Sequence, residues 1–154
     1  MKKSLSVLIL SLSLFMIGCS KNESTTLSNE LAENNSFEKY NILDIGEVEI
    51  DRKEEYEGDE YITAISKITN NSKDIVRDVS VDFSGFKDNV ILDSRSEHYD
   101  GSLTEGQSVV IEGLFSREDN LDDININSYS YHIGNKYYRV DLISKYVEIG
   151  EVEE

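Results

Sequence analysis

The chain contains one cysteine, Cys19, whose thiol stands in a setting that suggests one specific covalent reaction. Without a second cysteine it forms no intramolecular disulfide. It directly follows Gly18, at the end of an apolar run over residues 5–17 that Lys2 and Lys3 precede. Basic residues, a short apolar run and a small residue in this order are typical of a secretory signal peptide. The run is too short to span a bilayer, for which a helix needs about 20 residues.

The residues Met16-Ile17-Gly18-Cys19 resemble the lipobox of bacterial lipoproteins, with Met16 in the place where Leu is usual. The resemblance implies that Cys19 takes a diacylglyceryl group through a thioether and that a signal peptidase cuts between Gly18 and Cys19. Two acyl chains suffice for stable anchoring where one is marginal. We therefore expect a chain held by its lipid on the extracytoplasmic face of the cell membrane. A secretory signal without lipid and an N-terminal transmembrane anchor are the alternatives.

Two histidines are further side chains that could bind a metal or act as a base. His98 and His132 lie on different predicted segments, and we expect a zinc site to contain cysteine or more histidine. The sequence also lacks the Gly-x-Ser-x-Gly setting of a nucleophilic serine and a glycine-rich phosphate loop. We interpret both histidines as ordinary strand or loop residues, and we expect no catalytic residue, no metal ligand and no cofactor.

Acidic residues gather in two clusters. The first consists of Asp51, Glu54, Glu55, Glu57, Asp59 and Glu60, and the second of Glu118, Asp119, Asp122 and Asp123, with Asn120 between them. Calcium takes six to eight oxygen ligands, but neither cluster has the residue order of an EF-hand loop. We interpret the residues of both clusters as charged side chains of turns that are exposed to solvent. Weak calcium binding and a carboxylate pair for glycosidic chemistry are the alternatives.

The balance of charge restricts the partners that the chain attracts. The chain has 15 Lys and Arg against 31 Asp and Glu. Removal of residues 1–18 would take away Lys2 and Lys3 and no acid, which leaves 13 basic and 31 acidic residues and a net charge of −18. This charge repels phosphate backbones, so we expect no nucleic-acid binding, and it attracts cationic partners. Solubility is the simpler interpretation of the same charge.

Composition divides the chain into three parts. The signal peptide is expected over 1–18. Residues 19–36 contain Cys19 and a segment rich in Ser, Thr, Asn and Glu, which buries too little apolar surface to offset the entropy of ordering. We expect a lipidated cysteine and a disordered tether there. The remaining residues, 37–154, are enough for one small folded domain.

From Ile42 onward, apolar and polar residues alternate with the period of half-buried strands. Val79, Val81 and Phe83 are the clearest example. The other strands are expected within 42–50, 62–68, 89–93, 109–115 and 138–142, and in a segment that begins with Ile124 and Ile126 and ends near residues 134–135. About seven short strands without a long helical segment predict an all-β fold, an antiparallel immunoglobulin-like sandwich. The pattern alone leaves a small barrel open.

Four tyrosines, Tyr129, Tyr131, Tyr137 and Tyr138, flank residues 134–135 in an expected hairpin. Aromatic pairs across strands stabilise a sheet by roughly 0.2–1 kcal/mol each. Exposed tyrosines also mark binding surfaces. We expect sheet stabilisation, with ligand binding as the alternative.

Three runs, at 64–72, 76–83 and 103–115, resemble the FxLYD-type domains of Gram-positive lipoproteins. These domains have a strand, an Asn-x-Ser turn, a strand with alternating Val, and Leu-x-x-Gly-Glu/Gln before an edge strand. Phe86-Lys87-Asp88 stands near the place of the name-giving Leu-Tyr-Asp, and Glu105 replaces the usual Pro. The resemblance covers residues 64–115 and implies a β-sandwich without a shared catalytic reaction.

These features predict a membrane-anchored lipoprotein whose folded domain is a non-catalytic binding module for a protein or cationic ligand. An envelope hydrolase that uses acidic residues is one alternative, and turnover that depends on the acidic clusters would favour it. An accessory lipoprotein that sequesters cationic peptides or lysozyme is the other, and salt-sensitive binding would favour it.

Overall fold

The computed structural model describes residues 36–56 and 59–152, and their side chains over 37–52 and 61–152. The expected signal peptide over 1–18, the cleavage site at Gly18 and Cys19, and the tether up to residue 35 lie outside the described residues. Within the described ranges, no helix is both long and apolar enough to cross a membrane.

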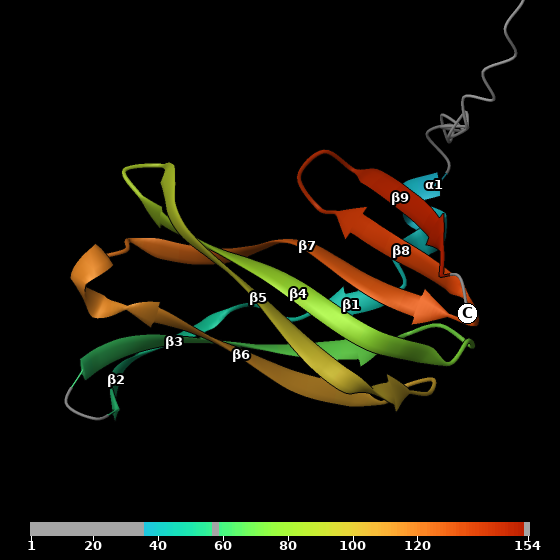
Figure 1. Ribbon diagram of the computed structural model, residues 1–154, viewed down its shortest axis with the longest axis horizontal. Coiled ribbons are helices and arrows are strands. Elements are labelled where there is room, and N and C mark those ends of the chain that lie inside the picture. The colour runs from blue at the N-terminus through green and yellow to red at the C-terminus, as the bar shows by residue number, and fades with distance from the viewer. Residues whose placement is uncertain (1–35, 57–58, 153–154) are drawn as a thin grey trace, which may run out of the picture. The chain divides into compact units, whose positions relative to one another are not determined.

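The described part of the chain folds into nine strands with two short helical segments (Figure 1). In chain order the elements are α1 (Ser36–Tyr40), β1 (Leu43–Ile45), β2 (Glu49–Tyr56), β3 (Asp59–Asn70), β4 (Val76–Lys87), β5 (Val90–Leu103), β6 (Ser108–Ser116), the 3-10 helix η1 (Arg117–Asp119), β7 (Asp123–Ile133), β8 (Lys136–Asp141) and β9 (Tyr146–Glu151). Sheet A has β3 at its centre, with β6 on one side and β1 and β2 on the other. Sheet B has the order β5-β4-β7-β8-β9, and every strand pair is antiparallel.

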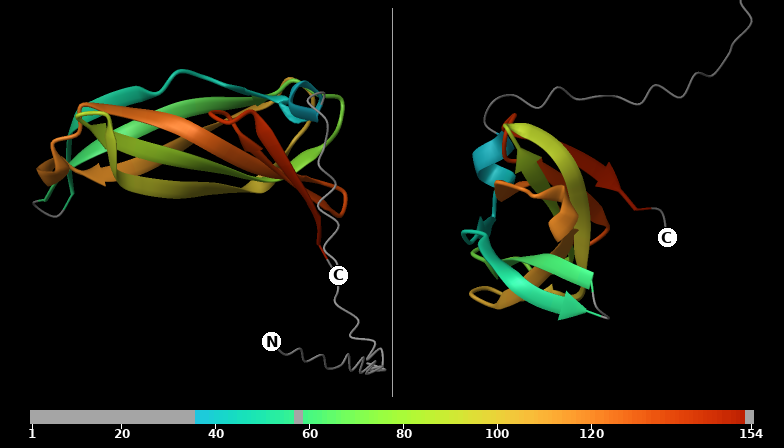
Figure 2. Two further views of the ribbon diagram at one scale, coloured as in Figure 1. Left: turned by 90° about the horizontal axis from the view of Figure 1, so that it is seen from above. Right: turned by 90° about the vertical axis from the view of Figure 1, so that its left-hand side faces the viewer.

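The two sheets lie face to face, as Figure 2 shows from two sides, so the predicted all-β antiparallel sandwich is confirmed. Val79, Val81 and Phe83 of β4 are fully buried, as their alternation predicts. On the opposite sheet, Gly113 of β6 leaves room for the Phe83 ring, which lies 3.1 Å from the position that a Cβ of residue 113 would take. The inward side chains of the two sheets therefore form one core between them.

The structure has nine strands where alternation indicated about seven, because β9 was not expected and residues 42–50, expected as one strand, form two. β5 runs over 14 residues, although only 89–93 was expected as a strand. It lies at the edge of sheet B, and most of its side chains are exposed, so the alternation of apolar and polar residues fades along it. β9 at the other edge is exposed in the same way and was not expected at all.

Gly46 divides residues 42–50, expected as one strand, into β1 and β2. Its backbone N–H donates to the Lys67 carbonyl at 2.9 Å, and its own carbonyl accepts from Ser66 Oγ at 2.9 Å. A Cβ at this position would lie only 2.9 Å from the Lys67 carbonyl oxygen. The close backbone approach therefore requires glycine and interrupts the regular pairing with β3.

Asn70 forms the Asn-x-Ser turn that the sequence predicts after β3. Its side chain is fully buried, and its Nδ2 donates to the carbonyls of Asp74 at 2.8 Å and Leu103 at 2.9 Å. Its Oδ1 accepts from the backbone N–H and the hydroxyl of Ser72. One buried amide therefore holds the β3–β4 turn against the end of β5.

A bulge in β4 at Asp78 changes which side chains reach the outer face of sheet B. The register shifts between Arg77 and Val79 on the β5 side and between Arg77 and Ser80 on the β7 side. Asp78 has φ 52°, in the left-handed region that aspartate tolerates better than most residues. Because Val76 and Val79 both stay buried, the extra residue directs the Asp78 side chain outward.

Candidate functional site

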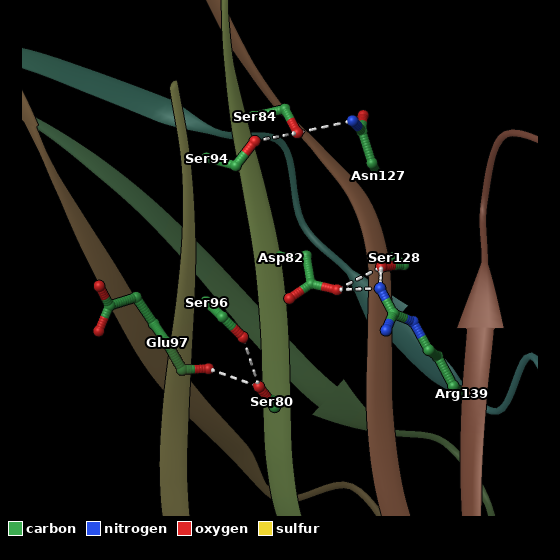
Figure 3. Close-up of polar contacts among 9 residues, drawn as sticks. All are labelled: Ser80, Asp82, Ser84, Ser94, Ser96, Glu97, Asn127, Ser128 and Arg139. Atoms are coloured by element: carbon green, nitrogen blue, oxygen red, sulfur yellow. Dashed lines mark hydrogen bonds and ion pairs between the residues drawn. The ribbon is translucent and has the colours of Figure 1, made fainter. Parts of the chain in front are cut away.

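Short polar side chains cover the outer face of sheet B, the face turned away from sheet A. We call it the serine face, and it consists of Ser80, Asp82 and Ser84 of β4, Ser94 and Ser96 of β5, Asn127 and Ser128 of β7, and Arg139 of β8 (Figure 3). Strand pairing places Asp82 opposite both Ser96 and Ser128. These side chains share one face because the residues between them on β4, Val81 and Phe83, point into the core.

Asp82 is the centre of a charged group on this face. It accepts from Ser128 Oγ at 2.5 Å and from Arg139 Nη2 at 2.9 Å, and the same Nη2 lies 3.3 Å from Ser128 Oγ. The side chains of Asp82 and Arg139 are 32% and 50% exposed, so the ion pair adds at most about 1 kcal/mol of stability. Its main effect is to fix where the guanidinium and the carboxylate point.

The serine side chains hydrogen-bond across the strands. Ser84 Oγ lies 3.4 Å from Ser94 Oγ and accepts from Asn127 Nδ2 at 2.7 Å. Ser80 Oγ lies 3.2 Å from Ser96 Oγ and donates to the Glu97 carbonyl at 3.2 Å. Serine has few rotamers to lose, so ordering such a surface in a complex costs little entropy. Ser84 and Ser128 are themselves buried, so the face presents the remaining serine hydroxyls together with amide, carboxylate and guanidinium groups in fixed positions.

The two histidines lie at one end of the same face, on either side of Asp78. His132 Nδ1 of β7 is 3.1 Å from Asp78 Oδ2, and His98 Nε2 of β5 is 2.7 Å from Asp100 Oδ1. Asp78, His98 and Asp100 each offer a ligand atom within 4.8 Å of the other two. Sequence reasoning considered the histidines separately and passed over both aspartates. The His-x-Asp spacing of residues 98–100, which puts both side chains on one side of a strand, was the available signal.

The second acidic cluster holds backbone in place around the start of β7. Asp122 accepts from Lys87 Nζ and from the backbone N–H of Asp88, both at 2.9 Å. The Asp88 N–H, and after it Lys87, lower the pKa of the Asp122 carboxyl below its ordinary value. Asp123 accepts from the backbone N–H of Ile124 at 2.9 Å. Glu118 and Asp119 lie in η1. These contacts agree with the interpretation of this cluster as turn charge.

The first acidic cluster lies on strands rather than in a turn. Asp51, Glu54 and Glu55 belong to β2, and Asp59 and Glu60 to β3, while Glu57 lies outside the described residues. The register explains the difference, because β2 and β3 continue pairing up to Tyr56 and Asp59. Asp51 is exposed together with three acidic residues that precede it. We call this set, Asp44, Glu47, Glu49 and Asp51, the acidic edge of sheet A.

The tyrosine hairpin forms as expected, with Tyr131 opposite Tyr138. Their rings stack with centroids 5.0 Å apart, both side chains are buried, and Tyr131 donates its hydroxyl hydrogen to the Tyr40 carbonyl at 2.8 Å. Burial raises the pKa of Tyr131 above its ordinary value. These two rings form part of a hollow of about 340 Å³ that Lys39, Tyr40, Ile42, Asp74, Ile133 and Lys136 complete. Packing of α1 against the hairpin therefore accounts for these tyrosines.

Tyr129 is buried as well, and its ring stacks on that of Tyr131 with centroids 6.0 Å apart. The fourth tyrosine, Tyr137, is only partly buried and lies on the opposite side of β8 from Tyr138. Its ring is 5.5 Å from that of His132 on the outer face of sheet B.

No protein-family model matches this chain, and no curated protein sequence matches it. A proposal about function therefore rests on the surfaces described above.

Proposed function

We propose that this chain is a membrane-anchored extracytoplasmic lipoprotein whose β-sandwich is a non-catalytic binding module. The lipobox-like sequence ending at Cys19 supports the anchor. The serine face supports the binding role, and it is the observation that carries the proposal. The serine face lies on one side of a sheet and is therefore flat and polar. We propose that its ligand is a polar component of the cell envelope with a surface that can lie against it.

Pre-organisation distinguishes the serine face from an ordinary solvated sheet surface. Long Lys and Glu side chains usually cover such a surface, and ordering them on binding costs roughly 0.5–1.5 kcal/mol each. Here Asp82, Ser128 and Arg139 are already joined by hydrogen bonds, as are Ser84 and Asn127. A polar ligand can therefore replace water on this face with little loss of side-chain freedom.

The proposal assigns no catalytic role to the described carboxylates. Asp122 and Asp123 bind backbone N–H groups of the loops beside them, and Asp82 is paired with Arg139. A glycosidic mechanism uses one carboxyl as an acid with a raised pKa. The pKa of Asp122 is shifted the other way, towards lower values. Asp122 is therefore arranged to stay ionised, and all three carboxylates hold neighbouring backbone or side chains in place.

Labelling tests the anchor directly. Cells that express the full-length chain and receive radioactive palmitate should label the wild type and leave the Cys19→Ala variant unlabelled. Localisation alone is ambiguous, because the variant can stay in the membrane as an uncleaved precursor. Mass spectrometry of the mature N-terminus should find a diacylglyceryl group on Cys19. An unmodified Cys19, or a mature chain that starts elsewhere, would contradict the anchor.

Photocrosslinking in intact cells tests the binding face. A photoreactive amino acid in place of Ser96, within the serine face, should give a discrete adduct, and adding Arg139→Ala should weaken it. The matched control places the same group at Glu112, which is exposed on β6 of sheet A. Digesting the adduct with protease or with glycosidase then identifies the class of ligand. Equal adducts at Ser96 and Glu112, or none at Ser96, would refute the serine face as the interface.

The acidic edge favours a second candidate function, the sequestration of cationic peptides or lysozyme. Four exposed acids follow one another from β1, through the residues that connect it to β2, into β2, and the mature chain that we expect carries a net charge of −18. Binding of lysozyme should decline steeply as the ionic strength rises from about 0.01 M to 1 M, because the screening length falls from roughly 30 Å to 3 Å.

A charge-matched pair of variants separates this surface from the overall charge. Replacement of Glu47, Glu49 and Asp51 by their amides should weaken lysozyme binding. Replacement of three exposed acids elsewhere, Glu105, Glu148 and Glu151, changes the net charge equally and should leave more binding intact. Equal losses in both variants would show that only the net charge matters, and binding that resists salt would exclude this function.

A further inference from the structure

Three side chains beside one end of the serine face lie close enough to one another to reach a single divalent metal ion after small rotations. The carboxylate of Asp78 on β4 and the His98 imidazole and Asp100 carboxylate on β5 offer ligand atoms that all lie within 4.8 Å of one another. His98 Nε2 and Asp100 Oδ1 are already 2.7 Å apart. Metal bonds of about 2.0–2.2 Å place neighbouring ligand atoms roughly 3–3.5 Å apart, so only small side-chain rotations separate the group from coordination.

The strands explain why these three residues meet. His98 and Asp100 are two residues apart on β5, so both side chains stand on the same side of the strand. The register with β4 is irregular here, since Val79 pairs with Tyr99 and Arg77 with Ser102. The bulge at Asp78 fills this interval and turns its carboxylate towards the β5 pair. The side chains of His98 and Asp100 are 47% and 89% exposed, so both are free to rotate onto an ion that arrives from solvent.

The donor set selects the class of metal. One imidazole nitrogen and two carboxylate oxygens suit first-row transition ions such as Zn²⁺. Ca²⁺ and Mg²⁺ prefer sites in which every ligand atom is oxygen, and Ca²⁺ is coordinated by six to eight of them. A neutral imidazole and two carboxylates carry two negative charges, which balance one divalent cation. Three protein ligands would leave at least one coordination position for water.

His132 provides a contact that positions Asp78. Its Nδ1 lies 3.1 Å from Asp78 Oδ2, which leaves the other carboxylate oxygen of Asp78 for an ion. Hydrogen bonds of this kind orient ligating carboxylates and support metal affinity. Arg77, the nearest cation in sequence, donates from its Nη2 to the Gly134 carbonyl at 2.7 Å, so its guanidinium is held at the β7–β8 turn.

We propose that Asp78, His98 and Asp100 form a binding site for a divalent transition metal of zinc-like preference, with His132 as a positioning residue. This site is separate from the Asp82–Arg139 group of the serine face, and it requires neither the lipid anchor nor a partner for the binding module. Its test can therefore fail or succeed independently of the proposed function.

Zinc titration of the purified full-length chain, without a polyhistidine tag, tests the proposal. The chain carries Cys19→Ser, so that the thiol does not compete for metal, and a chromophoric chelator reports free Zn²⁺. We expect saturable binding of one ion per chain, with little competition from excess Ca²⁺ or Mg²⁺. The imidazole signals of His98 in nuclear magnetic resonance spectra should shift as the site fills. Lack of saturable binding, or preference for Ca²⁺, would overturn the proposal.

Matched variants show whether the named residues hold the ion. His98→Gln and Asp100→Asn should weaken zinc binding by about 100-fold or more, and His132→Phe by roughly tenfold through Asp78. The control is Glu97→Gln, which removes the same charge from the neighbouring residue of β5. It should change the affinity less than about twofold, because general attraction of a cation to nearby acid is weak and screened. Similar losses in Glu97→Gln and Asp100→Asn would refute the site.

Discussion

At Gly85 of β4, the addition of a single methyl group should disturb the packing of the core. A Cβ at this position would stand 2.5 Å from Leu121 Cδ1 and 3.3 Å from Phe115 Cδ1, and both of these side chains are buried. We therefore expect Gly85→Ala to lower the free energy of unfolding in urea by about 1–3 kcal/mol. The matched control is Gly150→Ala on β9, where the nearest atom is 3.7 Å away.

A double variant tests the cause of this loss. Leu121→Ala alone creates a cavity, which costs roughly 2–5 kcal/mol. Because the shorter side chain also makes room for the new methyl group, Gly85→Ala should cost less in that background than in the wild type. Additive losses would mean that contact with Leu121 is not the source of the strain.

The inward face of β4 provides a second prediction at this scale. Phe83→Asp or Val81→Asp should unfold the domain, because a buried and unpaired carboxylate costs several kcal/mol. Both positions are fully buried. The control is Ser96→Asp, which adds the same carboxylate on the exposed side of β5. Circular dichroism and urea unfolding decide the matter, and a folded Phe83→Asp variant of wild-type stability would contradict this packing.

Individual residues were predictable from the sequence where a regular strand carries them. Val79, Val81 and Phe83 alternate without interruption, so their inward orientation follows from the two-residue period. The approach of Asp78 to the histidines was not predictable in this way. It depends on a left-handed residue in a bulge, which moves a side chain to the other face without leaving a periodic signal.

At the scale of elements, α1 is fixed to the β7–β8 hairpin by tyrosine hydroxyls. Tyr131→Phe removes the hydrogen bond to the Tyr40 carbonyl while keeping the ring stack with Tyr138. We expect a loss of about 1 kcal/mol in unfolding free energy, together with faster amide hydrogen exchange at Asn41, which donates to Phe37. Tyr137→Phe, on the outer side of the same hairpin, is the control and should change neither quantity.

The turn between β8 and β9 should contribute a pH-dependent stability. Asp141 accepts from the backbone N–H groups of Ser144 at 2.7 Å and Ile143 at 2.9 Å, and these bonds, that of Ser144 first, lower its pKa below 3.8. Its stabilisation is complete above the pKa of the unfolded chain and is lost as the pH falls through the lower folded value. Asp141→Asn should therefore be less stable than the wild type at pH 7, and the difference should shrink as the pH falls below the ordinary pKa of aspartate. A constant difference would contradict this assignment.

Edge strands limited what the sequence could reveal about the elements. The strands β3, β4 and β6 bury one face and expose the other, so their two-residue period could be recognised, although β6 also lies at an edge of sheet A. β5 and β9 lie at the edges of sheet B and bury few side chains, and the sequence therefore carries little alternation there. The serine face could not be predicted for a related reason. Alternation indicates that the polar residues between Val79, Val81 and Phe83 point to solvent, but it does not indicate that they hydrogen-bond to side chains of neighbouring strands.

At the scale of the whole molecule, the sandwich should account for the far-ultraviolet spectrum. The full-length chain in mild detergent should show mainly strand by circular dichroism, since the described helical segments have five and three residues. A spectrum dominated by helix would contradict the fold. The sequence predicted this architecture because about seven strand patterns in one small domain need two layers to bury their apolar faces.

The position of α1 has a mechanical consequence for a chain tied to a surface by its N-terminus, as we propose. Force that arrives along the tether reaches α1 before it reaches any strand. There the Tyr131 and Tyr129 hydroxyls hold Tyr40 and Asn41, and the Lys145 ammonium lies 4.7 Å from the centre of the Phe37 ring. These contacts would have to rupture before tension could peel β1 from β3. The contacts of α1 with β7 and with the β8–β9 turn would thus protect sheet A from force that is applied through the N-terminus, for example by a bound partner that pulls on the domain.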